Sequence, residues 1–136
     1  MKTYKGIITE LPDNGIFVFG SNTQGRHGKG AALIAKIKFG AIYGYARGFQ
    51  GKSFAICTKD LTKKLHPSVP KEHIMSQIEE LYYNANIING NDFYVAYGVN
   101  SNLNGYTPQE MANMFSSFPI PNNIVFNENF AKLIKV

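Results

Sequence analysis

A glycine-rich stretch with cationic side chains has the composition of an anion-binding site. Residues 25–32, GRHGKGAA, combine three glycines with an arginine, a histidine and a lysine. Glycine lets the backbone approach a ligand closely, and the N–H groups at the start of a helix favour negative charge. The spacing is neither G-x-G-x-x-G nor G-x-x-x-x-G-K-[ST], which excludes the ordinary dinucleotide and P-loop motifs. We therefore predict a phosphate-binding corner, with a ligand-free glycine-rich turn as the alternative.

Further polar residues follow other predicted strands. Asn22 stands at a strand end before the glycines, and Lys59 lies in a Thr-Lys-Asp segment after a strand. An asparagine in this position favours a polar contact with a ligand. Lys59 has two interpretations, a ligand contact or a solvated lysine at a strand end. Cys57 could act as a nucleophile with His27 or His66, but no partner spacing supports a dyad, and we interpret it as a core residue.

The composition narrows the class of protein. A hydrophobic content of 44% and a charged content of 17% are typical of a globular chain, and 136 residues fit one domain. One cysteine and three scattered histidines exclude an internal disulfide and predict no metal site, and we expect no cofactor. No apolar run is long enough for a bilayer and no secretory signal is recognisable, so we expect a cytoplasmic protein without membrane contact. The net charge of +5 is compatible with a phosphate-rich partner, although no basic block indicates general nucleic-acid binding.

Predicted strands and helices alternate along the chain. Apolar runs and turn signals predict strands at 4–9, 16–19, 53–57, 92–97 and 123–126. Helical periodicity predicts helices at 31–39, from about 70 to the Asn89-Gly90-Asn91 turn, from 108 to about 115 and at 130–134, with an irregular connection at 41–51. Thr107, Pro108 and Glu110 have the pattern of a capping box.

This alternation predicts an α/β fold with a largely parallel sheet. Ligands in such sheets bind beyond the carboxyl ends of the strands. The first glycine-rich loop, the Thr58-Lys59-Asp60 segment and the loop 98–106 each follow a predicted strand, so we expect them to form one cleft.

Four segments resemble motifs of a known family. VFGSN at 18–22, GRHGKGAA at 25–32, FGAIYG at 39–44 and TKD at 58–60 resemble small macrodomain-like proteins of phages and bacteria, over roughly residues 5–118. Macrodomains are ADP-ribose-binding modules, and the chain is also similar to the lysine-dependent macrodomains that hydrolyse ADP-ribosyl bonds. The resemblance implies a three-layer α/β/α fold of residues 1–136, with a mixed, largely parallel central sheet.

The same resemblance implies roles for individual residues. Lys59 falls at the position of the lysine that engages the distal ribose, and Asn104 replaces the aspartate that completes hydrolysis. Ile7 stands where macrodomains carry an aspartate for adenine. Catalytic positions are therefore Lys59 and Asn104, and the expected ligand-binding residues are Ser21, Asn22, Gly25, Arg26, His27, Gly28, Gly30, Ala31, Asn100, Ser101, Asn102, Leu103, Gly105 and Tyr106.

Three functions follow as expectations. The first is binding of ADP-ribose or a related nucleotide diphosphate between the two glycine-rich loops, with slow or absent hydrolysis because a positioned acid is missing. The second is an active ADP-ribosyl glycohydrolase that uses Lys59 on modified protein or DNA. The third is a phage nucleic-acid-associated accessory protein. The expected partner is an ADP-ribose-like small molecule or an ADP-ribosylated macromolecule, in the host cytoplasm if the protein is phage-encoded.

Overall fold

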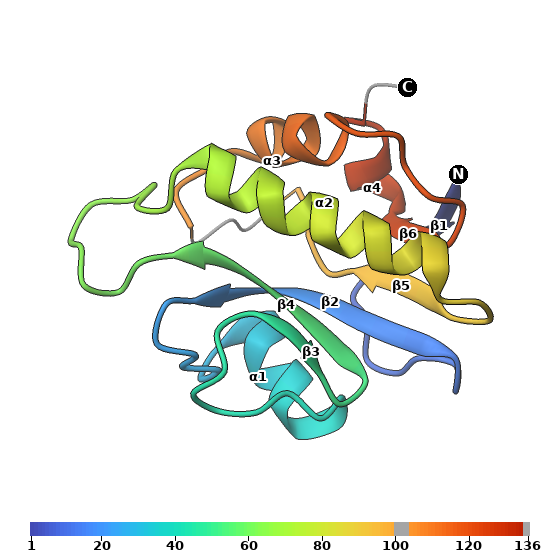
Figure 1. Cartoon of the computed structure of the whole chain (residues 1–136), viewed down its shortest axis with the longest axis horizontal. Coiled ribbons are helices and arrows are strands. Elements are labelled where there is room, and N and C mark those ends of the chain that lie inside the picture. The colour runs from blue at the N-terminus through green and yellow to red at the C-terminus, as the bar shows by residue number, and fades with distance from the viewer. Residues whose placement is uncertain (100–103, 135–136) are drawn as a thin grey trace.

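A six-stranded sheet forms the centre of the computed structural model, which describes residues 1–99 and 104–134 (Figure 1). The strand order is β1-β6-β5-β2-β4-β3, and every pairing is parallel except that of β3 with β4. The strands are β1 (Lys2–Tyr4), β2 (Gly15–Asn22), β3 (Gly48–Gln50), β4 (Ser53–Lys59), β5 (Asp92–Val95) and β6 (Ile124–Asn127). The predicted mixed, largely parallel sheet is confirmed.

Helices cover both faces of this sheet. They are α1 (Gly30–Lys38), α2 (Lys71–Ile87), α3 (Pro108–Phe115) and α4 (Glu128–Ala131). Figure 1 shows α1 on one face and the other three helices on the opposite face. The fold is therefore a three-layer α/β/α arrangement, as the sequence predicts. None of the described helices is long and apolar enough to cross a membrane.

The central strands are apolar on both faces, which gives the molecule two cores. Phe17 and Phe19 of β2 pack with Ala35 of α1, whereas Val18 belongs to the larger core with Ile78 of α2 and other residues of the opposite layer. Alternate side chains of a strand point to opposite faces, so a strand between two helical layers must be apolar at every position. This requirement explains why the IFVF run of β2 is so strong a strand signal.

The first strand differs from its prediction. The sequence predicts a strand over 4–9, but β1 is Lys2–Tyr4 and pairs with β6. Gly6 has a φ of +72°, which takes the chain out of the sheet, and Ile7 is 83% exposed. The Gly-Ile-Ile-Thr run was misleading because β-branched residues favour a strand without specifying a partner.

Two other elements also differ. The connection 41–51 contains β3, which pairs antiparallel with β4 and was predicted as irregular. The terminal helix is α4 at Glu128–Ala131 rather than 130–134, because the Asn127 side chain accepts hydrogen bonds from the backbone N–H groups of Asn129 and Phe130 and so starts the helix earlier. The other predicted strands and helices are present, with shifted ends.

The capping box of α3 is confirmed. Thr107 Oγ1 accepts a hydrogen bond from the Glu110 backbone N–H at 3.1 Å, and Glu110 Oε1 accepts one from the Thr107 N–H at 2.9 Å. These reciprocal bonds satisfy two N–H groups at the helix start. They also fix Thr107 as the residue at which the loop after β5 ends and α3 begins.

Candidate functional site

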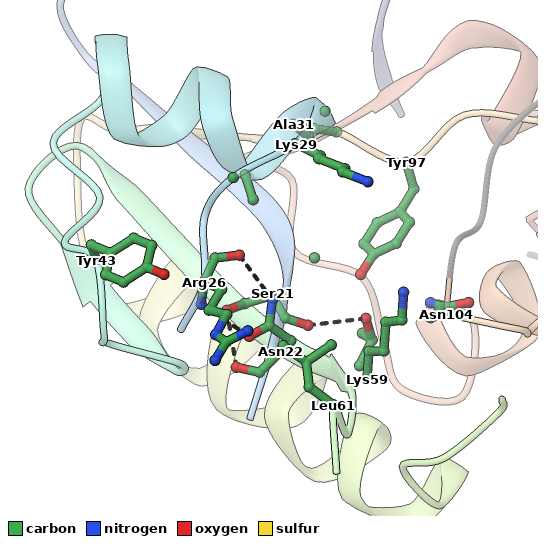
Figure 2. Close-up of a pocket in the computed structure, with 16 residues that line it drawn as sticks. Ser21, Asn22, Arg26, Lys29, Ala31, Tyr43, Lys59, Leu61, Tyr97 and Asn104 are labelled. Atoms are coloured by element: carbon green, nitrogen blue, oxygen red, sulfur yellow. Dashed lines mark hydrogen bonds between the residues drawn. The ribbon is translucent and has the colours of Figure 1, made fainter. Parts of the chain in front are cut away.

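A cleft of about 580 Å³ lies where β2, β4 and β5 end (Figure 2). The end of β2 contributes Ser21 and Asn22, the end of β4 contributes Lys59, and the chain after β5 contributes Tyr97 and Asn104. This is the edge at which open α/β sheets bind ligands, and the volume is in the range of small-molecule sites. The structure thus brings together residues from all three predicted segments.

The start of α1 forms one wall of the cleft. Residues 28–32 line it, and Lys29, the residue before the helix, has an extended backbone and makes no side-chain cap. The first turn of α1 also contains no acidic residue. The first N–H groups of a helix have no partner within the helix, and the helix dipole makes this end positive. The wall is therefore suited to an anion.

Asn22 shapes the glycine-rich loop from inside. Its Nδ2 donates to the Arg26 carbonyl at 2.9 Å, and its Oδ1 accepts from the N–H groups of Arg26 at 3.0 Å and Gln24 at 3.2 Å. The contacts between Asn22 and Arg26 are among the dashed lines in Figure 2. The amide of Asn22 is thus used mainly to hold the loop, although the residue lines the cleft as predicted.

Gly25 and His27, both predicted to bind ligand, do not line the cleft. Gly25 has a φ of +62°, and a Cβ there would collide with the backbone of Gly44. His27 is fully buried, lies edge-on to Phe19 and has its Nε2 3.3 Å from Ser21 Oγ. Burial lowers the pKa of His27, an effect that the Tyr45 backbone partly opposes. Both residues therefore pack the glycine-rich loop against the rest of the protein, Gly25 against Gly44 and His27 against Phe19 and Ser21, and do not face the cleft.

Three other residues of this loop lie open on the cleft. A Cβ built at Gly28 or Gly30 would meet no atom within 4 Å, and Arg26 is exposed at the mouth. Gly30 has a φ of +55°, which favours glycine there whatever the space. Ala31 follows on the same wall. At these positions the backbone is open to the cleft, which leaves room for the close approach of a ligand that the sequence predicts.

Lys59 and Asn104, the two predicted catalytic residues, lie at one end of the cleft. Figure 2 shows their side chains next to each other, with Lys59 half-buried at the end of β4. Asn104 is 5% exposed; its Oδ1 accepts from the Tyr106 N–H at 2.9 Å, and its Nδ2 donates to Met111 Sδ at 3.5 Å. Asn104 is therefore held in place by its own loop and by α3.

No carboxylate is among the described residues that line the cleft. Asp60 follows Lys59 in sequence but bonds away from the cleft, with its Oδ1 accepting from the N–H and the hydroxyl of Thr62 at 2.9 and 2.6 Å. These hydrogen bonds lower the pKa of Asp60. Such a carboxylate is a poor general base, since a lowered pKa means weaker proton affinity and its oxygen already accepts two hydrogen bonds from Thr62.

The second glycine-rich loop is only partly described. The predicted ligand contacts Asn100, Ser101, Asn102 and Leu103 lie outside the described residues. A Cβ at Gly105, whose φ is +88°, would collide with the backbone of His66 and Pro67. The Tyr106 hydroxyl donates to the Val69 carbonyl. Gly105 and Tyr106 thus join this loop to the segment after β4, and neither lines the cleft.

The structure adds cleft residues that the sequence analysis did not identify. Tyr43 lies at the mouth, 56% exposed, with the Lys36 ammonium 5.1 Å from its ring centroid. Tyr97 lies in the floor of the cleft, two residues after the end of β5. Its place between a strand and Gly98 was the available signal, but a β-type aromatic residue is ordinarily part of a core. Gly20, Leu61 and Ala96 also line the cleft without having been predicted, and Lys29, Ala32 and Thr58 line it within predicted segments although they were not named as ligand contacts.

Among residues 1–99 and 104–134 no group of three or more His, Cys, Asp or Glu side chains is placed to hold a metal ion. No protein-family model matches the sequence, and the comparisons with curated proteins and with solved structures gave no match either.

Proposed function

We propose that this protein binds ADP-ribose or a related nucleotide diphosphate in the cleft and hydrolyses ADP-ribosyl bonds slowly or not at all. The observation that carries the proposal is the uncapped start of α1, which opens on a cleft lined by Arg26, Lys29 and Lys59 without a described carboxylate. Helix N–H groups and cations together favour a multiply charged phosphate. The cleft volume of about 580 Å³ is suited to a nucleotide.

The chemistry of the Lys59 end supports slow turnover. Hydrolysis needs a group that moves a proton, and a positioned acid or base typically contributes about 10²- to 10⁴-fold in rate. Asn104 carries a neutral amide whose oxygen already accepts a hydrogen bond, and the Asp60 carboxylate bonds to Thr62. The described part of the cleft therefore has a cation to bind a sugar phosphate but lacks a base.

The alternative is an active ADP-ribosyl hydrolase. It is favoured by one observation, that Lys59 lines the cleft beside Asn104, as the resemblance to lysine-dependent macrodomains implies. Under this alternative the Lys59 amine would itself engage the distal ribose. The two proposals predict the same ligand and differ only in turnover.

Calorimetry tests the binding proposal. We expect ADP-ribose to bind, and AMP, which lacks the second phosphate and the terminal ribose, to bind at least tenfold more weakly. Loss of the second phosphate by itself removes charge-assisted hydrogen bonds of roughly 1.5–3 kcal/mol each. NAD is the third ligand, because it tests whether a base on the distal ribose is tolerated. Equal affinity for AMP and ADP-ribose, or no binding of ADP-ribose, would contradict the proposal.

Release of ADP-ribose from modified protein and DNA tests turnover. We expect little release by the parent protein and by Lys59→Ala, and a gain in Asn104→Asp, which restores a carboxylate. Lys63→Ala is the matched control, because Lys63 is exposed and does not line the cleft. Fast release by the parent that Lys59→Ala abolishes and Lys63→Ala preserves would establish the hydrolase instead.

A further inference from the structure

The hydroxyl of Tyr97 is buried in the cleft floor without a well-formed hydrogen bond. Tyr97 is 6% exposed, and its ring packs against Phe115 and Phe130 at centroid distances of 5.7 and 6.3 Å. In Figure 2 the hydroxyl end of this ring is directed toward the interior of the cleft. Among the described residues its oxygen has no hydrogen-bond partner of regular geometry. This is unusual, because buried hydroxyl groups are nearly always paired.

The described neighbours of this hydroxyl give it only an irregular contact. Gly20 lies beneath it, so close that a Cβ there would be 2.8 Å from the Tyr97 oxygen. The Thr58 hydroxyl donates to the Ser21 carbonyl at 3.4 Å. Its irregular contact with the phenol partly offsets the rise in the pKa of Tyr97. Burial raises the pKa of Tyr97, so the phenol stays protonated. The floor of the cleft therefore carries a neutral phenol that can both donate and accept a hydrogen bond.

We infer that the Tyr97 hydroxyl is a specificity-determining contact that hydrogen-bonds a hydroxyl group of the terminal sugar of the bound nucleotide. The inference rests on the proposed function. The N–H groups at the start of α1 and the Arg26 side chain can bind the phosphate oxygens, and Figure 2 shows Arg26 on the side of the cleft away from Asn104. Figure 2 shows Tyr97 on the same side of the cleft as Lys59 and Asn104, with the Lys29 ammonium directed toward this side. The Tyr97 phenol and the Asn104 amide are the neutral polar groups among these four side chains. A neutral sugar hydroxyl matches a neutral phenol in both donor and acceptor capacity.

The test compares two buried tyrosines in ADP-ribose and ADP binding. ADP has the diphosphate but no terminal ribose. We expect Tyr97→Phe to raise the Kd for ADP-ribose by roughly threefold to tenfold, the value of one hydrogen bond, and to leave the Kd for ADP unchanged. The melting temperature without ligand should stay the same or rise, because the substitution removes a buried hydroxyl that has no partner.

Tyr82→Phe is the matched control. The Tyr82 hydroxyl is also buried but donates to the Phe115 carbonyl at 2.6 Å. Its removal leaves that carbonyl unpaired, so the melting temperature should fall by several degrees while both Kd values stay the same. Tyr97→Phe should therefore weaken the binding of ADP-ribose without a loss of stability, whereas Tyr82→Phe should lower stability without a change in binding.

Each contrary result has a distinct meaning. An unchanged Kd for ADP-ribose in Tyr97→Phe, or a fall in its melting temperature as large as in Tyr82→Phe, would overturn the inference and leave the proposed function standing. An equal loss for ADP and ADP-ribose would overturn the assignment to the terminal sugar. Failure of the parent to bind ADP-ribose would overturn both proposals.

Discussion

Gly25 and Gly28 lie in one loop but serve different purposes. Gly25 has a left-handed backbone pressed against Gly44, so the fold requires it to be glycine. Gly28 lines the cleft without a positive φ, and a Cβ there would extend into open space. The first glycine allows the loop to pack, and the second leaves room for a ligand.

We expect Gly28→Val to raise the Kd for ADP-ribose at least tenfold, because its side chain occupies space beside the start of α1. The free energy of unfolding should change by less than about 1 kcal/mol, as for other surface substitutions. Calorimetry and urea unfolding measure the two effects. Gly25→Ala is the control and should be destabilised by about 2 kcal/mol or more through strain and collision. If Gly28→Val folds and binds ADP-ribose like the parent, residues 25–32 do not bind the phosphates of the ligand.

His27 should make stability depend on pH. Burial lowers the pKa of the folded histidine below its ordinary value of 6.5, so the unfolded chain takes up a proton at a higher pH than the folded chain does. The stabilisation is fully present above pH 6.5 and is lost as the pH falls below that value toward the folded pKa. We therefore expect the free energy of unfolding to fall between pH 7.5 and pH 5.5.

Urea unfolding of the parent and of His27→Gln at these two pH values isolates the effect. Glutamine cannot titrate, so its protein should be less stable than the parent at pH 7.5 and closer to it at pH 5.5. Parallel pH profiles for the two proteins would mean that His27 does not carry the dependence.

At the scale of elements, a side chain of α2 replaces a missing strand beside β4. β3 pairs with β4 only as far as Ala55. Two residues further on, Gln77 Oε1 accepts from the Cys57 N–H at 2.7 Å, and Gln77 Nε2 donates to the Cys57 carbonyl at 2.9 Å. Gln77 thus extends the sheet edge and fixes the backbone that leads to Lys59.

Gln77→Met keeps the approximate volume of the side chain and removes both hydrogen bonds. Two partly buried backbone groups of Cys57 then lose their partner, so we expect the free energy of unfolding to fall by about 2 kcal/mol. The Kd for ADP-ribose should also rise, because Lys59 lies two residues beyond Cys57. The control is Glu79→Met on the exposed side of α2, which should change neither quantity. Equal stability of the two variants in urea unfolding would show that the Gln77 contacts do not support β4.

At the scale of the whole molecule, the net charge of +5 acts together with the cations of the cleft. Attraction between exposed charges is screened within about 8–10 Å at physiological salt, so the binding of an anion should weaken as salt is added. We expect the Kd for ADP-ribose to rise several-fold between 50 and 300 mM NaCl in calorimetry. A Kd that is independent of salt would mean that Arg26, Lys29 and Lys59 do not meet the phosphates.

The alternative function, binding of nucleic acid, also depends on the positive charge of the whole molecule. A single-stranded oligonucleotide contacts many phosphates, so its binding should depend on salt more steeply than that of ADP-ribose. A competition experiment separates the two functions. If the cleft is a specific ADP-ribose site, ADP-ribose should remain bound when a short oligonucleotide is added at 150 mM NaCl. Tighter binding of the oligonucleotide, with release of ADP-ribose, would favour the nucleic-acid alternative.

The features that the sequence itself determined are those with local physical causes. The apolar run of β2, the periodicity of α2 and the capping box at Thr107 each depend on residues a few positions apart, and each was predictable. The anion-binding character of residues 25–32 was visible for the same reason, because glycine and positive charge act on the backbone beside them.

Only the tertiary structure decided which of these residues face the cleft. His27 is buried because it packs against Phe19 and contacts Ser21. Gly25 must be glycine because the backbone of Gly44 lies against it. Tyr97 fits in the floor of the cleft because Gly20 has no side chain. The strand β3 and the Gln77 contacts likewise depend on pairing with β4. Such contacts join chain segments whose relative positions no local pattern specifies, since packing rather than propensity sets them.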